Sequence, residues 1–251
     1  MTKSSPEIET RARERLAADE QRLSAEPAAK VNGSRRTSQT LGEAWRDFWR
    51  HPSPWLIATF LLGATAYRAT QSTFSWTELI VPVALVALFP VIEWVIHVAI
   101  LHWRPRTLGP VRIDSLLARE HRAHHADPRD LPLVFIPWKA LVWVLPSYVL
   151  VAWLAMPGWP SALTLLVSVY AIMFGYEWTH YLVHSDYRPR SRWYRSVWRN
   201  HRLHHYKNEH YWFTVTSAGT ADRLFGTYPA DPGAVQTSRT VKALHDLEAT
   251  G

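Results

Sequence analysis

Thirteen histidines occur in the 251-residue chain, and their spacing is the feature most able to support chemistry. Ten of them form four boxes with the patterns HxxxxH, HxxHH, HxxxH and HxxHH. In chain order the boxes contain His97 and His102; His121, His124 and His125; His180 and His184; and His201, His204 and His205. Neutral imidazole is a good ligand for iron, zinc or copper. Ten imidazoles are too many for one ion, so the pattern predicts two metal sites with four or five ligands each.

The spacing within each box indicates how a helix would present its imidazoles. Residues three and four apart share one helical face, so the HxxHH and HxxxH boxes each direct side chains the same way. The five-residue spacing of His97 and His102 is less regular, at about 140° around an ideal helix. We therefore expect the helix to end or bend at His102, just before Trp103 and Pro105. A lone interfacial histidine is usually a hydrogen-bonded surface group, which is the role predicted for His51 and His245.

Four hydrophobic segments separate the boxes, and each approaches the ~20 residues that a helix needs to cross the hydrocarbon core. They cover about residues 55–67 (extendable to 74), 79–101, 136–156 and 162–183. The first is the shortest, and it could instead be re-entrant or form a hairpin with the second. The HxxxxH box closes the second segment and the HxxxH box closes the fourth, while both HxxHH boxes lie in polar connections. Four crossings place all ten imidazoles at one membrane face.

The basic residues indicate which face this is. Lys and Arg number 10 in residues 1–54, 7 in 102–139 and 10 in 184–251, but only 1 in 68–76. Positive charge collects on the cytoplasmic side of membrane proteins. The sequence thus predicts an all-α, multi-pass membrane protein with four transmembrane helices in two hairpins. Both termini, a histidine-rich helical cap and the metal site are expected on the cytoplasmic side.

The polar flanks and the composition add further expectations. Residues 1–40 are predicted to be a polar mobile tail, and 41–251 the membrane-embedded domain. Thr40 and Glu43 have capping-box spacing, which predicts an interfacial helix over about 41–50. The net charge of +7 arises from arginines that flank apolar segments, which favours lipid headgroups over nucleic acid as the counter-charge. The absence of cysteine excludes disulfides and thiolate-bound metal.

Two histidine-bound metals beside a lipid phase could activate dioxygen if they are iron, or hydrolyse a substrate if they are zinc. Hydrolysis usually needs a carboxylate base, and Glu93 and Glu177 lie one turn before box histidines. We favour instead a role for both as acceptors for an imidazole N–H. Asp222 is a candidate partner for a ligand histidine, or a turn residue, and His210 is either close to the last box or on the surface.

The order of the boxes resembles that of the fatty acid hydroxylase superfamily, which also contains sterol desaturases and carotenoid hydroxylases. It looks most like the fatty acid 2-hydroxylase branch. The segments 207–213 (KNEHYWF) and 222–227 (DRLFGT) are also similar to the C-terminal pattern of that superfamily. The resemblance covers about residues 80–230, and the four boxes together are its specific part.

The resemblance implies a monooxygenase of lipid metabolism that hydroxylates an unactivated C–H bond of a fatty acyl chain or related lipid. It implies two iron ions, for which zinc can substitute in crystals, O2 as co-substrate, and the ten box histidines as ligands. Unlike the fungal and animal lipid hydroxylases, the sequence shows no cytochrome b5-like domain. A separate ferredoxin or cytochrome is therefore expected as electron donor. Its predicted docking patch consists of Arg188, Arg190, Arg192, Arg195, Arg199 and Arg202, which could equally contact lipid headgroups.

Two alternatives remain at this level. Desaturation of a lipid, sterol or carotenoid shares the first hydrogen abstraction, so ligand spacing does not separate it from hydroxylation. A non-enzymatic metal-binding or transport protein is less favoured, because transporters place ligands near the bilayer midplane.

Aromatic residues near the boxes are candidates for a substrate entrance, or for interfacial anchoring and packing. They are Trp178, Tyr181, Tyr206, Tyr211, Trp212 and Phe213.

Overall fold

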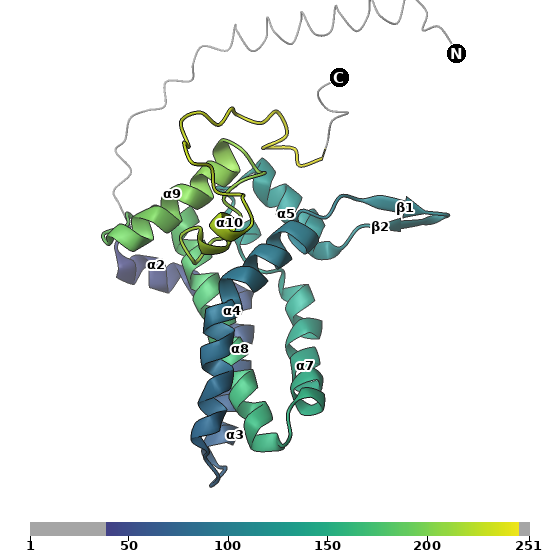
Figure 1. Ribbon diagram of the computed structural model, residues 1–251, viewed down its shortest axis with the longest axis vertical. Helices are drawn as coiled ribbons and strands as arrows, with labels where there is room; N and C mark the ends of the chain where they lie inside the picture. Colours follow the sequence, from purple (N-terminus) through teal and green to yellow (C-terminus); the bar gives the residue numbers. More distant parts are fainter. Residues whose placement is uncertain (1–38, 246–251) are drawn as a thin grey trace, which may run out of the picture. The chain divides into compact units, whose positions relative to one another are not determined.

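The computed structural model describes residues 39–245, so the predicted tail over 1–40 falls almost wholly outside the described residues. The described part is mostly helical (Figure 1). Its helices are α2 (Leu41–Phe48), α3 (Pro52–Ala69), α4 (Ile80–Ile96), α5 (Leu116–Ala126), α6 (Leu131–Val134), α7 (Trp138–Ala155), α8 (Trp159–His184), α9 (Arg192–Tyr206) and α10 (Thr220–Leu224). A 3-10 helix, η1 (Trp76–Leu79), precedes α4, and a π-helix, η2 (His97–Leu101), follows it.

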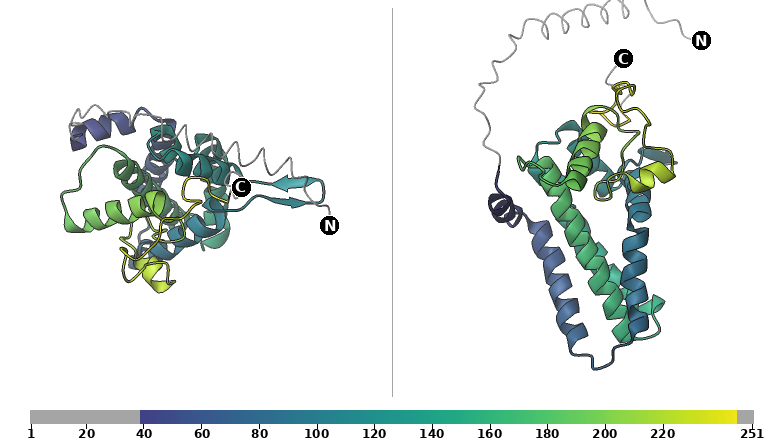
Figure 2. Two further views of the ribbon diagram at one scale, coloured as in Figure 1. Left: turned by 90° about the horizontal axis from the view of Figure 1, so that it is seen from above. Right: turned by 60° about the vertical axis from the view of Figure 1, so that its left-hand side comes forward.

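Helices α3, α4, α7 and α8 form a bundle, in which α8 contacts each of the other three. Its core is built from apolar side chains of three helices, including Ile57 on α3, Leu145 on α7 and Leu166 on α8. The Tyr170 hydroxyl donates to the carbonyl of Leu145 at 2.8 Å, which satisfies the one polar atom of a buried ring. Helices α5 and α9 and the segment after α9 gather at one end of the bundle, which we call the cap end (Figures 1 and 2).

Three helical stretches are long and apolar enough to cross a membrane: Trp76–Leu101, Leu131–Ala155 and Trp159–His184. Four crossings were predicted, and α3 is not among these three. It is nevertheless 18 residues long and packs along α8. Near its C-terminal end, Arg68 pairs with Glu78 at 2.8 Å. A shorter apolar run and a charged end explain why α3 differs from the other three bundle helices.

The predicted start of the first described helix is confirmed in detail. The Thr40 hydroxyl accepts from the backbone N–H of Glu43, and the Glu43 carboxylate accepts from the backbone N–H of Thr40 at 2.8 Å. This capping box satisfies two N–H groups that the helix itself leaves unpaired. One side of α2 then packs into the bundle through Phe48, which is buried against Phe135 and Tyr181.

A two-stranded antiparallel hairpin corrects the expectation of an all-α fold. Strands β1 (Arg106–Leu108) and β2 (Val111–Ile113) pair between η2 and α5. Gly109 at the turn has a φ of +59°, a left-handed conformation that glycine adopts without strain. Strands of three residues carry too little alternation to be recognised in a connection that also contains several arginines.

Candidate metal centre

The ten box histidines converge at the cap end of the bundle in two groups of five. Within each group the ligand nitrogens all lie within 4.8 Å of one another. Group A consists of His97, His102, His121, His125 and His204, and group B of His124, His180, His184, His201 and His205. Eight of the ten are buried, and His102 and His184 are partly buried. The structure therefore brings together every histidine that the boxes singled out.

The division between the groups runs through both HxxHH boxes. On α5, His121 and His125 belong to group A, whereas His124 belongs to group B. On α9 the assignment is reversed, because His201 and His205 belong to group B and His204 to group A. On a helix, a residue four positions along is offset by about 40° in one direction, whereas a residue three positions along is offset by about 60° in the opposite direction. Each box therefore contributes a pair to one group and a single imidazole to the other.

The HxxxxH box reaches group A through the π-helix η2. The N–H of His102 donates to the carbonyl of His97 at 2.9 Å, which is an i→i+5 bond. The wider π-helical turn brings residues five apart to the same face, so His97 and His102 both point into group A. The helix was predicted to end or bend at His102; it does end there, after a π-helical turn that explains the spacing.

The distances between imidazole nitrogens fit ligands around shared ions. In group B the Nε2 atom of His201 lies 3.1 Å from that of His180, 2.9 Å from that of His184 and 3.0 Å from that of His205. One imidazole nitrogen carries at most one hydrogen, so hydrogen bonding does not account for three such neighbours. Two nitrogens at right angles around an ion, each about 2.1 Å from it, would be about 3.0 Å apart.

Group A shows the same spacing, and each group contains a buried Nε2 atom without a hydrogen-bond partner. Its Nε2–Nε2 distances are 3.1 Å for His97 and His121 and 3.2 Å for His102 and His204. Within the described residues, the buried Nε2 atoms of His124 and His125 have no hydrogen-bond partner. Buried polar atoms without partners are rare and point to a ligand. The donor set in both groups thus fits a nitrogen-binding metal.

Backbone carbonyls orient several of the rings. The Nδ1 atoms of His97, His204, His184 and His125 lie 2.5, 2.7, 2.9 and 3.1 Å from the carbonyls of Phe213, Tyr211, Pro128 and Val241, respectively. A carbonyl only accepts, so each Nδ1 carries the hydrogen and the Nε2 lone pair is left for a metal. The carbonyls therefore select both the tautomer and the direction of these four imidazoles.

Burial keeps the imidazoles of the cap neutral. Desolvation lowers the pKa of His121, His124 and His125 well below the ordinary value. Desolvation, followed by the neighbouring His97, lowers the pKa of His204 to about 3. Neutral imidazole is the metal-binding form, so these side chains are in the form that binds metal at neutral pH.

Glu93 and Glu177 do not have the role predicted for them as acceptors for an imidazole N–H. Glu93 accepts from the backbone N–H groups of Val215 and Thr216, both at 2.9 Å, and from the Thr216 hydroxyl at 3.0 Å. Glu177 accepts from the backbone N–H of Ile136 at 3.0 Å and from the Ser53 hydroxyl. Each buried carboxylate therefore holds a loop rather than a ring.

Each of these loops in turn contacts a box histidine. Two residues before Val215, the carbonyl of Phe213 accepts from His97 of group A. Two residues before Ile136, the backbone of Val134 is hydrogen-bonded to His180 of group B. The carboxylate at the end of each membrane helix thus reaches the first histidine of its own box through a short backbone segment.

The remaining polar candidates, and the two histidines outside the boxes that were predicted to be surface groups, have different roles. Asp222 is buried and accepts from the N–H groups of Phe213 at 2.8 Å and Thr214 at 3.0 Å. It therefore holds the segment 211–216, which we call the group A loop, instead of a histidine. The side chain of His210 is 65% exposed, which places it on the surface. His245 is hydrogen-bonded, as predicted, through its Nε2 to the carbonyl of His102 at 2.8 Å. His51 stacks on Phe135, with ring centroids 4.1 Å apart.

The six aromatic candidates for a substrate entrance mostly pack elsewhere. Trp178 and Tyr181 belong to the aromatic cluster that anchors α2, where Phe48 lies 5.0 and 5.6 Å from their rings. Tyr206 stacks with the cations of Arg202 and Lys242 at the surface. Tyr211, Trp212 and Phe213 belong to the group A loop, where Phe213 packs 5.2 Å from the ring of His102.

A cavity that the sequence did not reveal reaches the histidines from the bundle. Its volume is about 260 Å³, and it lies between α4, α7 and α8. The polar side chains in its wall are Glu93, His97, Tyr148 and Tyr176, and the rest are apolar: Phe89, Ile96, Ile100, Leu101, Leu117, Ile136, Ala140, Leu141, Val144 and Met173. A neighbouring space of about 50 Å³ shares Leu101, Leu117, Ile136 and Tyr176 with this wall and is also lined by His121 and His180. Both histidine groups thus border one apolar approach.

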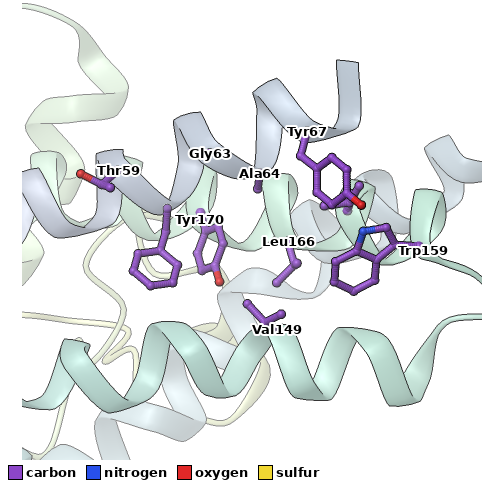
Figure 3. Close-up of a pocket in the computed structure, with 10 residues that line it drawn as sticks. Thr59, Gly63, Ala64, Tyr67, Val149, Trp159, Leu166 and Tyr170 are labelled. Carbon is purple, nitrogen blue, oxygen red and sulfur yellow. The ribbon is translucent and has the colours of Figure 1, made fainter. Parts of the chain in front are cut away.

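A second cavity, of about 320 Å³, lies between α3, α7 and α8 and is lined by residues such as Thr59, Tyr67 and Trp159 (Figure 3). No box histidine contributes to its wall. It is therefore not the site at which the histidine groups would act.

Comparisons with known proteins agree with this geometry. The fatty acid hydroxylase family model matches residues 82–227, a stretch that contains all four boxes. Among solved structures, the chain is similar to one described as "Full length scs7p (only hydroxylase domain visible)", with a TM-score of 0.59 and 21% identity over 74% of this chain and 70% of that one. At this identity the likeness shows the fold alone. No curated protein matches the chain.

The matched region confirms the resemblance that the boxes indicated over residues 80–230. It unites the apolar helices, the histidine groups and the apolar approach in one domain. The chain is therefore a mostly helical, multi-pass membrane protein that belongs to the fatty acid hydroxylase family.

Proposed function

We propose that this protein is a membrane di-iron oxygenase that hydroxylates an unactivated C–H bond of a lipid, with O2 and external electrons. The observation that carries the proposal is the apolar cavity whose wall includes His97 of group A and adjoins the smaller space lined by His121 and His180. A hydrocarbon substrate can thus approach the ligands of both ions without passing through water. Membership of the fatty acid hydroxylase family supports the same reaction class.

The ligand set favours two iron ions held by the ten histidines of groups A and B. When bound, iron supplies oxygen activation and one-electron chemistry, whereas zinc is redox-inert. The chain's own residues hold the imidazoles in the Nδ1–H tautomer and exclude water around them. Each group offers five imidazoles to an ion, and oxygen activation would need a coordination position that these ligands leave open.

The cavity also favours the substrate class. It lies between helices that are apolar enough to cross the bilayer, and its wall is almost wholly aliphatic and aromatic. A fatty acyl chain or a related lipid matches that wall, and can enter from the bilayer. A sterol or carotenoid substrate, and desaturation in place of hydroxylation, are the outcomes that product analysis must separate.

We further propose that α3 is a fourth crossing, so that both termini and the histidine groups lie on the cytoplasmic side. In support, α3 runs along α8 from the cap end. Among the described residues, every Lys and Arg except Arg68 lies in the cap-end segments 39–54, 102–139 and 184–245. A separate ferredoxin or cytochrome would dock on the arginines of α9 and the preceding loop. Helix α9 has no acidic residue and carries three of the ligand histidines, which gives an acidic donor a short route to both groups.

The deciding experiment is product analysis in a lipid-defined host that expresses the chain with a ferredoxin system. Hydroxylation adds one oxygen to the lipid mass, whereas desaturation removes two hydrogens. The protein purified anaerobically should contain about two iron atoms, as two five-histidine groups imply. An iron-loaded protein that makes no oxygen-dependent product, or that moves metal across proteoliposomes, would contradict the proposal.

A further inference from the structure

The β1–β2 hairpin extends sideways from the helices at the cap end of α4 (Figure 1). Every residue of both strands is exposed. A lone two-stranded hairpin is only marginally stable in water, and three strands or a packed face are usually needed. A surface that covers one face of this hairpin would therefore stabilise it.

The pairing register separates an apolar face from a polar one. Leu108 is opposite Val111, and Arg106 is opposite Ile113, while Thr107 is opposite Arg112. Because side chains alternate along a strand, Leu108, Val111 and Ile113 share one face with Arg106. These three apolar residues are 64, 59 and 39% exposed. Thr107 and Arg112 lie on the other face.

The hairpin lies at the level where the bundle meets the membrane surface. The membrane-crossing stretch Trp76–Leu101 ends five residues before Arg106, and the next such stretch begins at Leu131. The connection between these two stretches, which contains the hairpin, therefore begins and ends at the same membrane face. Trp103, a residue type enriched at that depth, lies 5.0 Å below the guanidinium of Arg106.

The charges around the apolar face fit an anionic surface. Arg104, Arg106 and Arg112 are all exposed. The nearby acid, Asp114, lies 2.7 Å from Arg122 and 3.6 Å from Arg112, so it offsets part of the charge of Arg112 but not that of Arg104 or Arg106. Basic side chains beside exposed apolar ones are the composition that binds the boundary between headgroups and acyl chains.

We propose that the β1–β2 hairpin docks on the anionic lipid surface of the bilayer, with Leu108, Val111 and Ile113 at the acyl boundary and Arg104 and Arg106 on lipid phosphates. The hairpin directly connects the end of η2 with α5. Docking would therefore fasten to the membrane the two elements that present His97, His102 and the first HxxHH box.

The chain lacks cysteine, so single-cysteine labelling tests this directly. A nitroxide is attached at Leu108→Cys and, as the matched control on the opposite face of the same strand, at Thr107→Cys. Each full-length protein is placed at one copy per nanodisc of phosphatidylcholine and phosphatidylserine. The label at position 108 should be several-fold less accessible to a water-soluble relaxation agent, and more accessible to oxygen, than the label at 107.

Equal water accessibility at the two positions would overturn the proposal. Protection of position 108 only in discs that hold two copies would identify a second chain as the occupant, and would overturn it as well. Discs of phosphatidylcholine alone, or the pair R104Q and R106Q, should reduce the protection; unchanged protection would overturn the part assigned to these two arginines. Metal content equal to that of the unlabelled protein shows that each variant is folded.

Discussion

Groups A and B are built to the same plan from different backbone. Each takes two histidines from the end of its own membrane helix, a pair four apart from one HxxHH box and a single imidazole from the other. The pair of group B comes from the regular end of α8, whereas the pair of group A needs the π-helix η2. The five-residue spacing of His97 and His102 can therefore give ligand positions equivalent to the four-residue spacing of His180 and His184, because a π-helical turn contains one more residue than an α-helical turn.

The groups also differ in what holds them. Group A depends on the segment after α9, because the carbonyls of Phe213, Tyr211 and Val241 orient three of its five rings. Group B depends on the connection between α5 and α7, through Pro128 and Val134. Glu93 and Glu177 are the equivalent anchors of these two backbone segments. We therefore expect that one group can be perturbed without the other.

The largest effect is expected from loss of the single imidazole that an HxxHH box contributes to the opposite group from its pair. H204A removes the imidazole that α9 contributes to group A, and H124A removes the one that α5 contributes to group B. Both should abolish product formation, because the proposed reaction needs both ions. Metal analysis should show preferential loss from one group in each variant. Equal loss from both groups in either variant would mean that they are not separable sites.

Removing the anchoring carboxylates should have the next largest effect. E93A leaves the buried N–H groups of Val215 and Thr216 without acceptors, which should lower the free energy of unfolding by about 2–4 kcal/mol. E177A should act similarly through Ile136. Thermal unfolding measures the loss of stability, and cobalt absorption of the reconstituted proteins reports which group is distorted.

The critical outcome for these two variants is whether each one affects a single histidine group. E93A should disturb the cobalt spectrum of group A, and E177A that of group B. E93Q and E177Q, which retain an acceptor oxygen, should restore much of the stability. Identical spectra for E93A and E177A would contradict their assignment to separate groups.

A smaller and one-sided effect is expected from D222N. Asp222 holds the group A loop through the N–H groups of Phe213 and Thr214, and asparagine keeps one acceptor oxygen of the two. Loss of one charge-assisted bond should cost about 1.5–3 kcal/mol of stability. Metal titration should show weaker binding to group A and unchanged binding to group B. A change confined to group B would refute the role assigned to this loop.

No effect is expected from H210A, which is the negative control for all the histidine variants. His210 lies five residues beyond the last box, but its side chain is 65% exposed and belongs to neither group. Metal content, unfolding temperature and product formation should equal those of the parent protein. Loss of metal here would show that the two groups do not include all the ligands.

Local patterns predicted the elements of this fold well where the signal was long or specific. Hydropathy located α4, α7 and α8, and the Thr40–Glu43 spacing located the start of α2. The hairpin was missed because its strands have three residues each. The roles of Glu93 and Glu177 were missed because their backbone partners, Val215 and Ile136, lie 122 and 41 residues away along the chain, respectively. Sequence spacing carries no information about such contacts.

By itself the sequence determined which histidines come together, because box spacing, apolar segments and charge placement are all local properties that act through helix geometry and the membrane. Only the tertiary structure decided how the ten divide into two groups, since that depends on the angle at which α5 and α9 approach the ends of α4 and α8. It also decided that buried carboxylates hold loops and that an apolar cavity meets His97. Those features arise from packing between distant segments, where buried polar groups must find partners wherever the fold supplies them.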